Sequence, residues 1–181
     1  MGLIHRTLLL GGLMAAVGCS DRPSAPVLAV EAVYRHDESG LRFLTPDGWA
    51  PLARVDLPAG RLDKPTRMVA YVQAGAAAPA EIELYAVDLP AEANLVNYLL
   101  KEQRIGPEKW QVKSPPADTL VRGVKASRFE LRAGAGKTER RRDVVAFRRG
   151  GRLFLFLFTG SASATADVET FQRCVNSATW D

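Results

Sequence analysis

Residues Gly134 to Thr138 read Gly-Ala-Gly-Lys-Thr, a combination that could cradle the phosphates of a nucleotide. A phosphate-binding loop needs a further glycine five positions before Gly136, and that position is Leu131. It also needs a helix directly after the loop, whereas the segment that follows here has the pattern of a strand. The motif therefore predicts a hairpin loop and not a nucleotide site.

His36 is followed by Asp37 and Glu38, three residue types that could contribute to a metal site or an acid/base pair. The chain has 2 histidines, and the other, His5, lies in the leader described below. Neighbouring residues on a strand point to opposite faces, so these three side chains do not converge easily. We expect a solvent-exposed hairpin at this point, with no metal and no cofactor.

Glu81 and Glu83 are two residues apart in a segment that alternates like a strand, so their side chains share one face about 7 Å apart. Paired carboxylates at such a separation can perform acid/base catalysis. Exposed strand faces place acids at this spacing routinely, and no cluster of aromatic residues accompanies them. The spacing is typical of a solvated face and indicates no catalytic residue.

The densest charge in the chain is a group of arginines on two consecutive predicted strands and the turn between them. Guanidinium groups can bind carboxylates and phosphates through two parallel hydrogen bonds, so the group is a candidate site for anionic lipid headgroups, lipopolysaccharide phosphate or an acidic protein. The alternative is a charged edge that prevents strand-to-strand aggregation. The six residues are Arg140, Arg141, Arg142, Arg148, Arg149 and Arg152.

Cys19 is the remaining residue whose surroundings indicate chemistry. Arg6 precedes an apolar run from Thr7 to Val17, which is too short to span a bilayer but suits the hydrophobic core of a signal peptide. The run ends in Ala16-Val17-Gly18-Cys19, which resembles the lipobox of bacterial lipoproteins, although leucine is more usual at the place of Ala16. The resemblance implies cleavage before Cys19 and acylation of its thiol. An ordinary signal peptide, with Cys19 incidental, is the alternative.

These features divide the chain into a signal peptide (1–18), a proline-containing tether (19–29) and one globular domain (30–181). We expect the mature protein outside the cytoplasm, in the periplasm and lipid-anchored to a bacterial membrane, where nucleic acid is not a partner. The residue directly after Cys19 is Ser20, and Asp21 comes only after it. By resemblance to Gram-negative sorting signals, this order favours the outer membrane if the cell is Gram-negative. Cys174 is the one other cysteine, and we expect it to be a buried thiol.

The positions of the elements follow from residue patterning. Leu153 to Phe158 alternates leucine and phenylalanine, so both faces of this strand are apolar and it should be central and covered on both sides. The helices expected to supply this cover are Ala91 to Arg104 and a last helix that begins near Thr165, an N-cap residue. The prediction is an α+β fold, a three-layer α/β/α sandwich with a mostly antiparallel central sheet. The other expected strands are Val30 to Tyr34, Leu41 to Leu44, Arg54 to Leu57, Thr66 to Gln73, Glu81 to Leu89, Val121 to Leu131 and Arg141 to Phe147.

The domain resembles a known family in several places. Phe43-Leu44-Thr45-Pro46-Asp47-Gly48-Trp49 is similar to the F-x-x-P-x-G-W opening of PsbP-like domains, which are related in fold to the Ran-binding Mog-type proteins. Val121 to Ala126 is similar to the family's G-x-x-A strand, and the order of elements agrees from Val30 to Trp180. The resemblance implies an antiparallel sheet between helices. It implies no single activity, because the family includes subunits of the photosynthetic oxygen-evolving complex, a GTPase partner and many bacterial lipoproteins.

Together these observations predict a lipoprotein that acts as a non-enzymatic binding or assembly module. The membrane would be contacted through lipid on Cys19, and a protein or anionic envelope component through the arginines. An envelope hydrolase is the first alternative, and a cleft where Glu81, Glu83, Asp88 or His36 converge would favour it. A carrier of small apolar ligands is the second, and an apolar cavity between the sheet and a helix would indicate it.

Overall fold

The computed structural model of the chain describes residues 32–75, 79–98 and 109–181, all of which belong to a unit that spans Glu31–Asp181. More than half of the described residues lie in strands. The elements in chain order are β1 (Val33–His36), the 3-10 turn η1 (Asp37–Ser39), β2 (Leu41–Leu44), β3 (Trp49–Arg54), β4 (Thr66–Gln73), β5 (Glu81–Asp88), α1 (Leu95–Asn97), β6 (Gln111–Val121), β7 (Val124–Ala133), the 3-10 turn η3 (Gly136–Thr138), β8 (Arg140–Arg149), β9 (Arg152–Ser161), α2 (Thr165–Asn176) and β10 (Thr179–Trp180).

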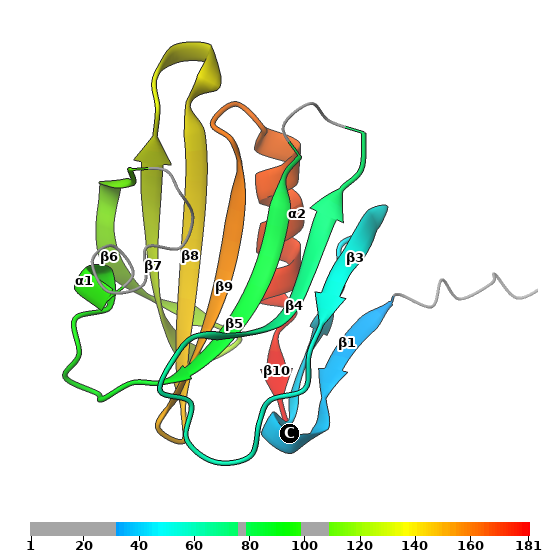
Figure 1. Ribbon diagram of the computed structural model, residues 1–181, viewed down its shortest axis with the longest axis vertical. Helices are drawn as coiled ribbons and strands as arrows, with labels where there is room; N and C mark the ends of the chain where they lie inside the picture. The colour runs from blue at the N-terminus through cyan, green and yellow to red at the C-terminus, as the bar shows by residue number, and fades with distance from the viewer. Residues whose placement is uncertain (1–31, 76–78, 99–108) are drawn as a thin grey trace, which may run out of the picture. The chain divides into compact units, whose positions relative to one another are not determined.

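Seven strands form the main sheet in the order β3-β4-β5-β9-β8-β7-β6, and each neighbouring pair is antiparallel. A second sheet has the order β1-β2-β10. Figure 1 shows the main sheet from one side, with the β7–β8 hairpin extending beyond the neighbouring strands.

Strand β9 is the fourth of the seven strands, and its sequence explains the two cores. Phe154, Phe156 and Phe158 belong to one buried hydrophobic cluster, and Leu153, Leu155 and Leu157 belong to another. The two clusters lie on opposite faces because successive side chains of a strand alternate. The prediction of a central strand with a phenylalanine face and a leucine face is confirmed.

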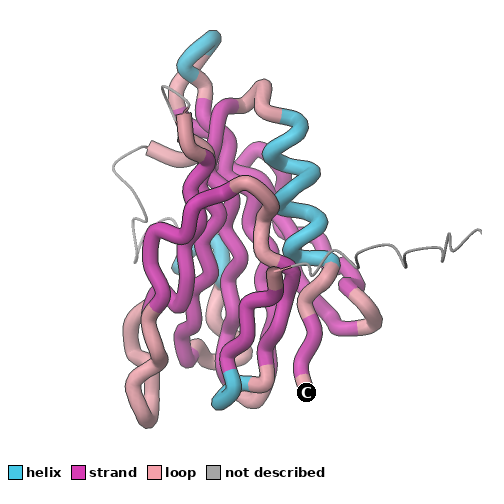
Figure 2. Tube along the Cα trace, turned by 90° about the vertical axis from the view of Figure 1, so that its right-hand side faces the viewer, coloured by secondary structure: helices cyan, strands magenta, loops and turns pink. Residues whose placement is uncertain are grey.

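The phenylalanine face is covered by helix α2 together with the small sheet. Figure 2 shows α2 lying along one side of the main sheet. From α2, Val168, Phe171 and Val175 are buried in this core, as their spacing predicts, and from the small sheet Tyr34 and Phe43 pack against them. The predicted α+β fold, a three-layer α/β/α sandwich, is therefore wrong, because the described residues are mostly β-sheet. The hairpin β1–β2 joins β10 in a separate sheet and supplies cover that the prediction assigned to helices alone.

On the leucine face, the described cover comes from the segment around α1. Leu95 and Trp110 pack against the leucine cluster, and Tyr98 is buried within it. Most of the predicted helix Ala91 to Arg104 falls on residues 99–108, which lie outside the described residues. All members of the two clusters fall between Tyr34 and Trp180, so the unit Glu31–Asp181 contains both of its hydrophobic cores.

Helix α2 begins at Thr165 and contains Cys174. The N-cap is Ala164, which makes no side-chain capping bond, so the assignment of Thr165 as N-cap is wrong. Cys174 is completely buried, and burial raises the pKa of its thiol to about 12. The expectation of a buried thiol is confirmed.

The longest strand, β6, is an element that sequence patterning misses. It contains Pro115 and Pro116, which cannot donate to a ladder and usually argue against a strand. Both residues are tolerated because β6 is at the edge of the sheet, and its register with β7 shifts on either side of Ser114. The opposite edge strand, β3, carries Pro51 at a similar irregularity. Prolines at both edges hinder the addition of further strands.

The carboxyl end of the chain fastens the small sheet. The Asp181 amide donates to the Gly40 carbonyl at 3.1 Å, and Arg42 binds the Asp181 carboxylate at 2.6 Å. Gly40 has φ of 64°, and a Cβ there would lie 2.9 Å from the Asp181 carbonyl oxygen, so both its conformation and this contact require glycine.

His36, in the same hairpin, is 7% exposed, and its Nδ1 is 2.9 Å from the Ser39 hydroxyl. The expected solvent-exposed setting is therefore wrong for His36.

Candidate functional site

The candidate arginines form two groups at opposite ends of strand β8. Arg140, Arg141 and Arg142 begin the strand, whereas Arg148 and Arg149 end it, in register with the start of β9. Six residue steps separate Arg142 from Arg148, which is about 20 Å along a strand. The six arginines therefore cannot bind one small anion together.

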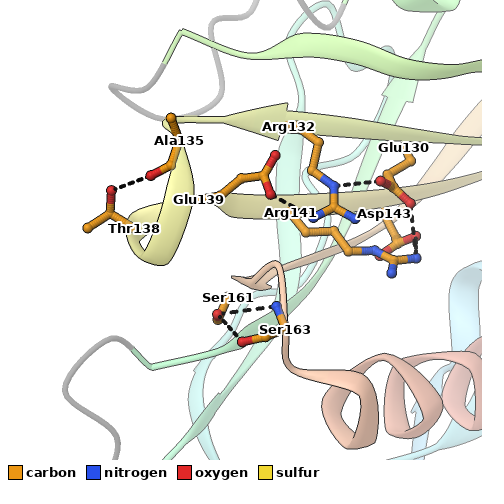
Figure 3. A network of polar contacts seen from close by, with 9 residues as sticks. All are labelled: Glu130, Arg132, Ala135, Thr138, Glu139, Arg141, Asp143, Ser161 and Ser163. Atoms are coloured by element: carbon orange, nitrogen blue, oxygen red, sulfur yellow. Dashed lines mark hydrogen bonds and ion pairs between the residues drawn. The ribbon is translucent and has the colours of Figure 1, made fainter.

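Arg141 belongs to an ion-pair network next to the loop of the β7–β8 hairpin, shown in Figure 3. Its guanidinium makes two hydrogen bonds to Asp143, at 2.6 and 2.7 Å, and a third contact to Glu130 at 3.2 Å. Arg132 binds Glu130 at 2.6 Å from the other side and Glu139 at 3.5 Å. Arg132 is in register with Arg141, and Glu130 with Asp143, so like charges lie opposite each other across the two strands. The ion pairs therefore run along each strand, and one runs diagonally from Arg141 to Glu130. The hydrogen bond and the charge of Asp143 raise the pKa of Arg141. This network links the two hairpin strands. Its contacts with Asp143 and Glu130 make Arg141 less available to an external anion.

Arg142 points to the other face and is buried, with 6% of its surface exposed. Its Nε donates to the Thr159 hydroxyl at 2.9 Å, and its guanidinium carbon lies 4.3 Å from the centre of the Trp110 ring. Stacking on an aromatic ring suits the planar, weakly hydrated guanidinium. Arg142 is therefore part of the leucine-face core.

At the far end of β8, Arg148 and Arg152 hold loops against the sheet. Arg152 binds Asp88 at 2.8 Å and the Gly60 carbonyl at 3.1 Å, and the Leu62 amide donates to the same carboxylate. The hydrogen bond from Arg152, supported by that amide, lowers the pKa of Asp88 below its ordinary value. Arg148 is exposed but donates to the carbonyls of Leu89 and Pro90.

Arg149 is exposed, and its guanidinium carbon lies 5.5 Å from the Trp180 ring centre. With Arg61, Arg152, Asp88 and Glu38 it lines an open groove of about 690 Å³. The groove contains three arginines, but Asp88 and Glu38 also line it. Because charges of both signs are present, the groove is poorly suited to binding a simple anion.

A larger charge asymmetry becomes visible when the three neighbouring strands β6, β7 and β8 are considered together. Residues 109–149 contain 12 basic and 4 acidic side chains, a net charge of +8, whereas the whole chain has +4. The rest of the sequence therefore has a net charge of −4. We call the surface of residues 109–149 the basic half-sheet.

The exposed charge of the basic half-sheet is even less balanced than its total charge. In this stretch, which the structure describes throughout, the exposed acidic residue is Asp118, because Glu130, Glu139 and Asp143 are buried or half-buried. An exposed surface with one sign of charge attracts anionic partners and accelerates their encounter. The exposed basic residues are Lys109, Lys113, Arg122, Lys125, Lys137, Arg148 and Arg149.

Most of these cations were missed by the sequence interpretation, which looked for consecutive arginines. Lys113, Arg122 and Lys125 are spaced along β6 and β7 and attract no notice as a run. A count of net charge for each segment finds them, because residues 109–149 exceed the charge of the whole chain.

The candidate acid/base residues do not converge. Glu81 and Glu83 share the leucine face of β5, whereas Asp88 is on the opposite face, about 23 Å along the strand from Glu81 and about 17 Å from Glu83. His36 belongs to the other sheet. The cleft that would favour a hydrolase is not formed by these four residues.

Glu83 is buried, so the expectation of a solvated face is wrong for this residue. Its carboxylate accepts from the Tyr85 hydroxyl at 2.9 Å and contacts Arg67 at 3.3 Å. Burial, supported by the charge of Glu83, raises the pKa of Tyr85 above its ordinary value. The Glu83 carboxylate therefore already has two partners in the structure, the Tyr85 hydroxyl and the Arg67 guanidinium.

The remaining candidate motifs have simple structural settings. Gly136–Thr138 forms the 3-10 turn of the β7–β8 hairpin and is followed by strand β8, as expected of a hairpin loop. Within the described residues, no group of three or more histidine, cysteine, aspartate or glutamate side chains is placed to hold a metal ion. None of the helices described is long and apolar enough to cross a membrane. Cys19 lies outside the described residues.

Comparison with known proteins shows a likeness of fold. No protein-family model matches the sequence, and no curated protein matches it. The cyanobacterial PsbP protein (CyanoP) of Synechocystis sp. PCC 6803 has a similar solved structure, with a TM-score of 0.58 and 15% sequence identity, over 87% of this chain and 98% of CyanoP. The chain therefore has a PsbP-like fold.

Two further solved structures are more distant. LpqN of Mycobacterium tuberculosis, a protein involved in cell envelope biogenesis, has a TM-score of 0.49 and 14% identity over 82% of this chain and 89% of LpqN. PA94 of Pseudomonas aeruginosa has a TM-score of 0.38 and 14% identity over 78% of this chain and 88% of its own. Neither likeness is strong enough to support a statement about function.

Proposed function

We propose that this chain is an exported, lipid-anchored, non-enzymatic binding module whose basic half-sheet binds anionic lipid headgroups. The observation that carries the proposal is the exposed charge of residues 109–149, with seven exposed cations and Asp118 as the exposed acid. The separation of Glu81 and Glu83 from Asp88 and His36 favours binding over hydrolysis.

The anchor rests on the segment that ends at Cys19. An apolar run followed by Val17-Gly18-Cys19 suits cleavage and acylation, and Ser20 after the cysteine favours the outer membrane of a Gram-negative cell. Each buried methylene contributes about 0.8 kcal/mol, so more than one acyl chain gives stable attachment. The proposed organisation is a signal peptide (1–18), a tether (19–29) and the domain (30–181).

Mass spectrometry of protein extracted from its native membrane tests the anchor. We expect the mature chain to begin at Cys19, with its mass increased by acyl groups. A Cys19→Ser variant should lose these groups and leave the membrane fraction on a salt wash. An unprocessed Met1 with an unmodified thiol at Cys19 would contradict this part of the proposal.

Headgroup binding by the basic half-sheet has a simple physical basis. Each Lys or Arg near an anionic membrane surface contributes about 1 kcal/mol, and this attraction is screened within about 10 Å at moderate salt. Guanidinium groups add paired hydrogen bonds to phosphate oxygens. The rest of the domain, residues 31–108 and 150–181, has 10 basic and 15 acidic side chains, and this net charge of −5 is repelled by the same surface.

Vesicle binding by the unit Glu31–Asp181, which contains both hydrophobic cores, tests the headgroup proposal without the lipid anchor. We expect binding to vesicles that contain phosphatidylglycerol and none to vesicles of phosphatidylcholine alone. Neutralising two exposed cations in Lys113→Gln/Lys137→Gln should weaken binding about thirtyfold, because about 2 kcal/mol is lost.

The matched control neutralises two exposed cations outside the basic half-sheet, in Arg35→Gln/Lys64→Gln. Both double variants change the net charge equally, so a difference between them reports position and not total charge. Equal weakening by the two, or binding that does not fall as salt is raised, would rule out a headgroup site on β6–β8.

A further inference from the structure

An apolar groove of about 900 Å³ lies on the leucine face within reach of the basic half-sheet. Ala146 and Leu153, both buried, form its base. Leu120 from β6 and Leu95 from α1 contribute further apolar side chains to its lining. The volume is within the range of sites for small molecules.

The groove exists because small side chains meet across the strands at this point. Ser127 and Ala146 are register partners on β7 and β8, and Asp118 is the partner of Ser127 on β6. Two residues further along, the corresponding pair is Phe129 with Val144, which fills the leucine face. Leu120 is 68% exposed and is the most exposed of the large hydrophobic residues described.

Charged side chains are placed at the rim of this apolar groove. Lys125 and Arg148 are exposed and line it. Asp118 also lines it, and its carboxylate is 3.5 Å from the Ser127 hydroxyl, which donates to it. The rim therefore has a net positive charge, while the interior is formed largely by alanine and leucine side chains.

We propose that this groove binds a single amphipathic anion, an acyl chain with a carboxylate or phosphate head. The chain would lie along Leu95, Leu120 and Leu153, and the head would contact Lys125 and Arg148. The inference rests on the proposed function in that the same basic half-sheet attracts the anionic headgroups, but it adds a binding site for one molecule. A completely polar anion would leave the leucines exposed, and a neutral amphiphile would leave both cations unused.

Calorimetric titration of the unit Glu31–Asp181 with dodecanoate, below its micellar concentration, tests the proposal. We expect saturable binding of one molecule, weakened about fifteenfold when decanoate replaces dodecanoate, because two methylenes leave the groove. Dodecyl phosphate should bind similarly, whereas dodecyl maltoside, with the same chain and a neutral head, should bind several-fold more weakly. Similar affinity of all three would show a purely apolar site and overturn the anionic assignment.

Two variants separate the groove from the charged surface around it. Ala146→Leu fills the base of the groove and should abolish dodecanoate binding while leaving vesicle binding unchanged, because no charge is altered. Leu120→Ser alters an exposed side chain, so the domain should fold normally and bind dodecanoate several-fold more weakly. Lys125→Gln should weaken dodecanoate but not dodecyl maltoside, and Lys137→Gln, at the hairpin tip, should affect neither.

The outcomes distinguish this inference from the proposed function. Vesicle binding without dodecanoate binding, or dodecanoate binding that Ala146→Leu and Leu120→Ser leave unchanged, would refute the groove alone. Dodecanoate binding without vesicle binding would support the groove and refute the headgroup surface. Saturation by an acidic peptide with an apolar side chain, but not by dodecanoate, would assign the groove to a protein partner and overturn the inference.

Discussion

Replacing Phe156 with alanine lowers the free energy of unfolding by about 3–5 kcal/mol. Phe156 is completely buried on the central strand β9, where it lies 5.2 Å from Phe43 and 5.7 Å from Phe147 between ring centres. Truncation removes the apolar surface of the ring and leaves a cavity between the main sheet and the small sheet. Both aromatic contacts are lost at the same time.

Urea denaturation of the unit Glu31–Asp181 measures this effect, with Leu52→Ala as the control. Leu52 is 56% exposed on the edge strand β3, so its truncation should change the free energy of unfolding by less than about 0.5 kcal/mol. Similar small losses from both variants would show that the phenylalanine face is not the packed core on which this description depends.

Replacing Asp143 with alanine should cost about 2–3 kcal/mol of unfolding free energy. Asp143 accepts both short hydrogen bonds of Arg141, and its side chain is only 10% exposed. Without it, the half-buried Arg141 keeps its contact with Glu130, a carboxylate that Arg132 also binds. The loss therefore includes the cost of a poorly compensated guanidinium.

A second variant shows whether charge pairing causes this loss. Arg141→Met/Asp143→Leu replaces both partners by apolar side chains of similar size, and we expect it to recover to within about 1 kcal/mol of the parent protein. Thermal or urea denaturation of the three proteins measures the difference. A double variant as unstable as Asp143→Ala would indicate that other packing, and not the ion pair, stabilises the loop end of the hairpin.

The elements that the sequence predicts correctly are those with strong local patterns. The alternation of Leu153 to Phe158 predicts the central strand and the side on which each residue lies. Val168, Phe171 and Val175 predict the inner face of α2 in the same way. These signals depend on residues close together in the chain, where periodicity is sufficient.

The layering depends on contacts between distant residues and could not be predicted. The amide of Leu44 donates to the Ser177 hydroxyl at 2.8 Å, and Trp180 pairs with Leu41, so the two ends of the domain build one sheet. A two-residue strand such as β10 carries no periodicity of its own. The sandwich prediction assumed that helices alone cover the main sheet, whereas the small sheet covers part of its phenylalanine face.

The charged residues show a similar division between local and long-range information. Strand alternation places Arg141 and Arg142 on opposite faces. Their roles depend on the register of β8 with β7, which brings Glu130 beside Asp143, and on Trp110, which is distant in the chain. Consecutive arginines therefore indicate a strand of high charge, but which of them are available to a partner depends on the tertiary structure.

Lysine acetylation footprinting on anionic vesicles tests the central claim most directly. With the unit Glu31–Asp181 bound to phosphatidylglycerol vesicles, the account predicts that Lys109, Lys113, Lys125 and Lys137 are protected, while the exposed Lys64, outside residues 109–149, reacts as it does in solution. Protection of Lys64, with the four lysines of the basic half-sheet still reactive, would contradict it.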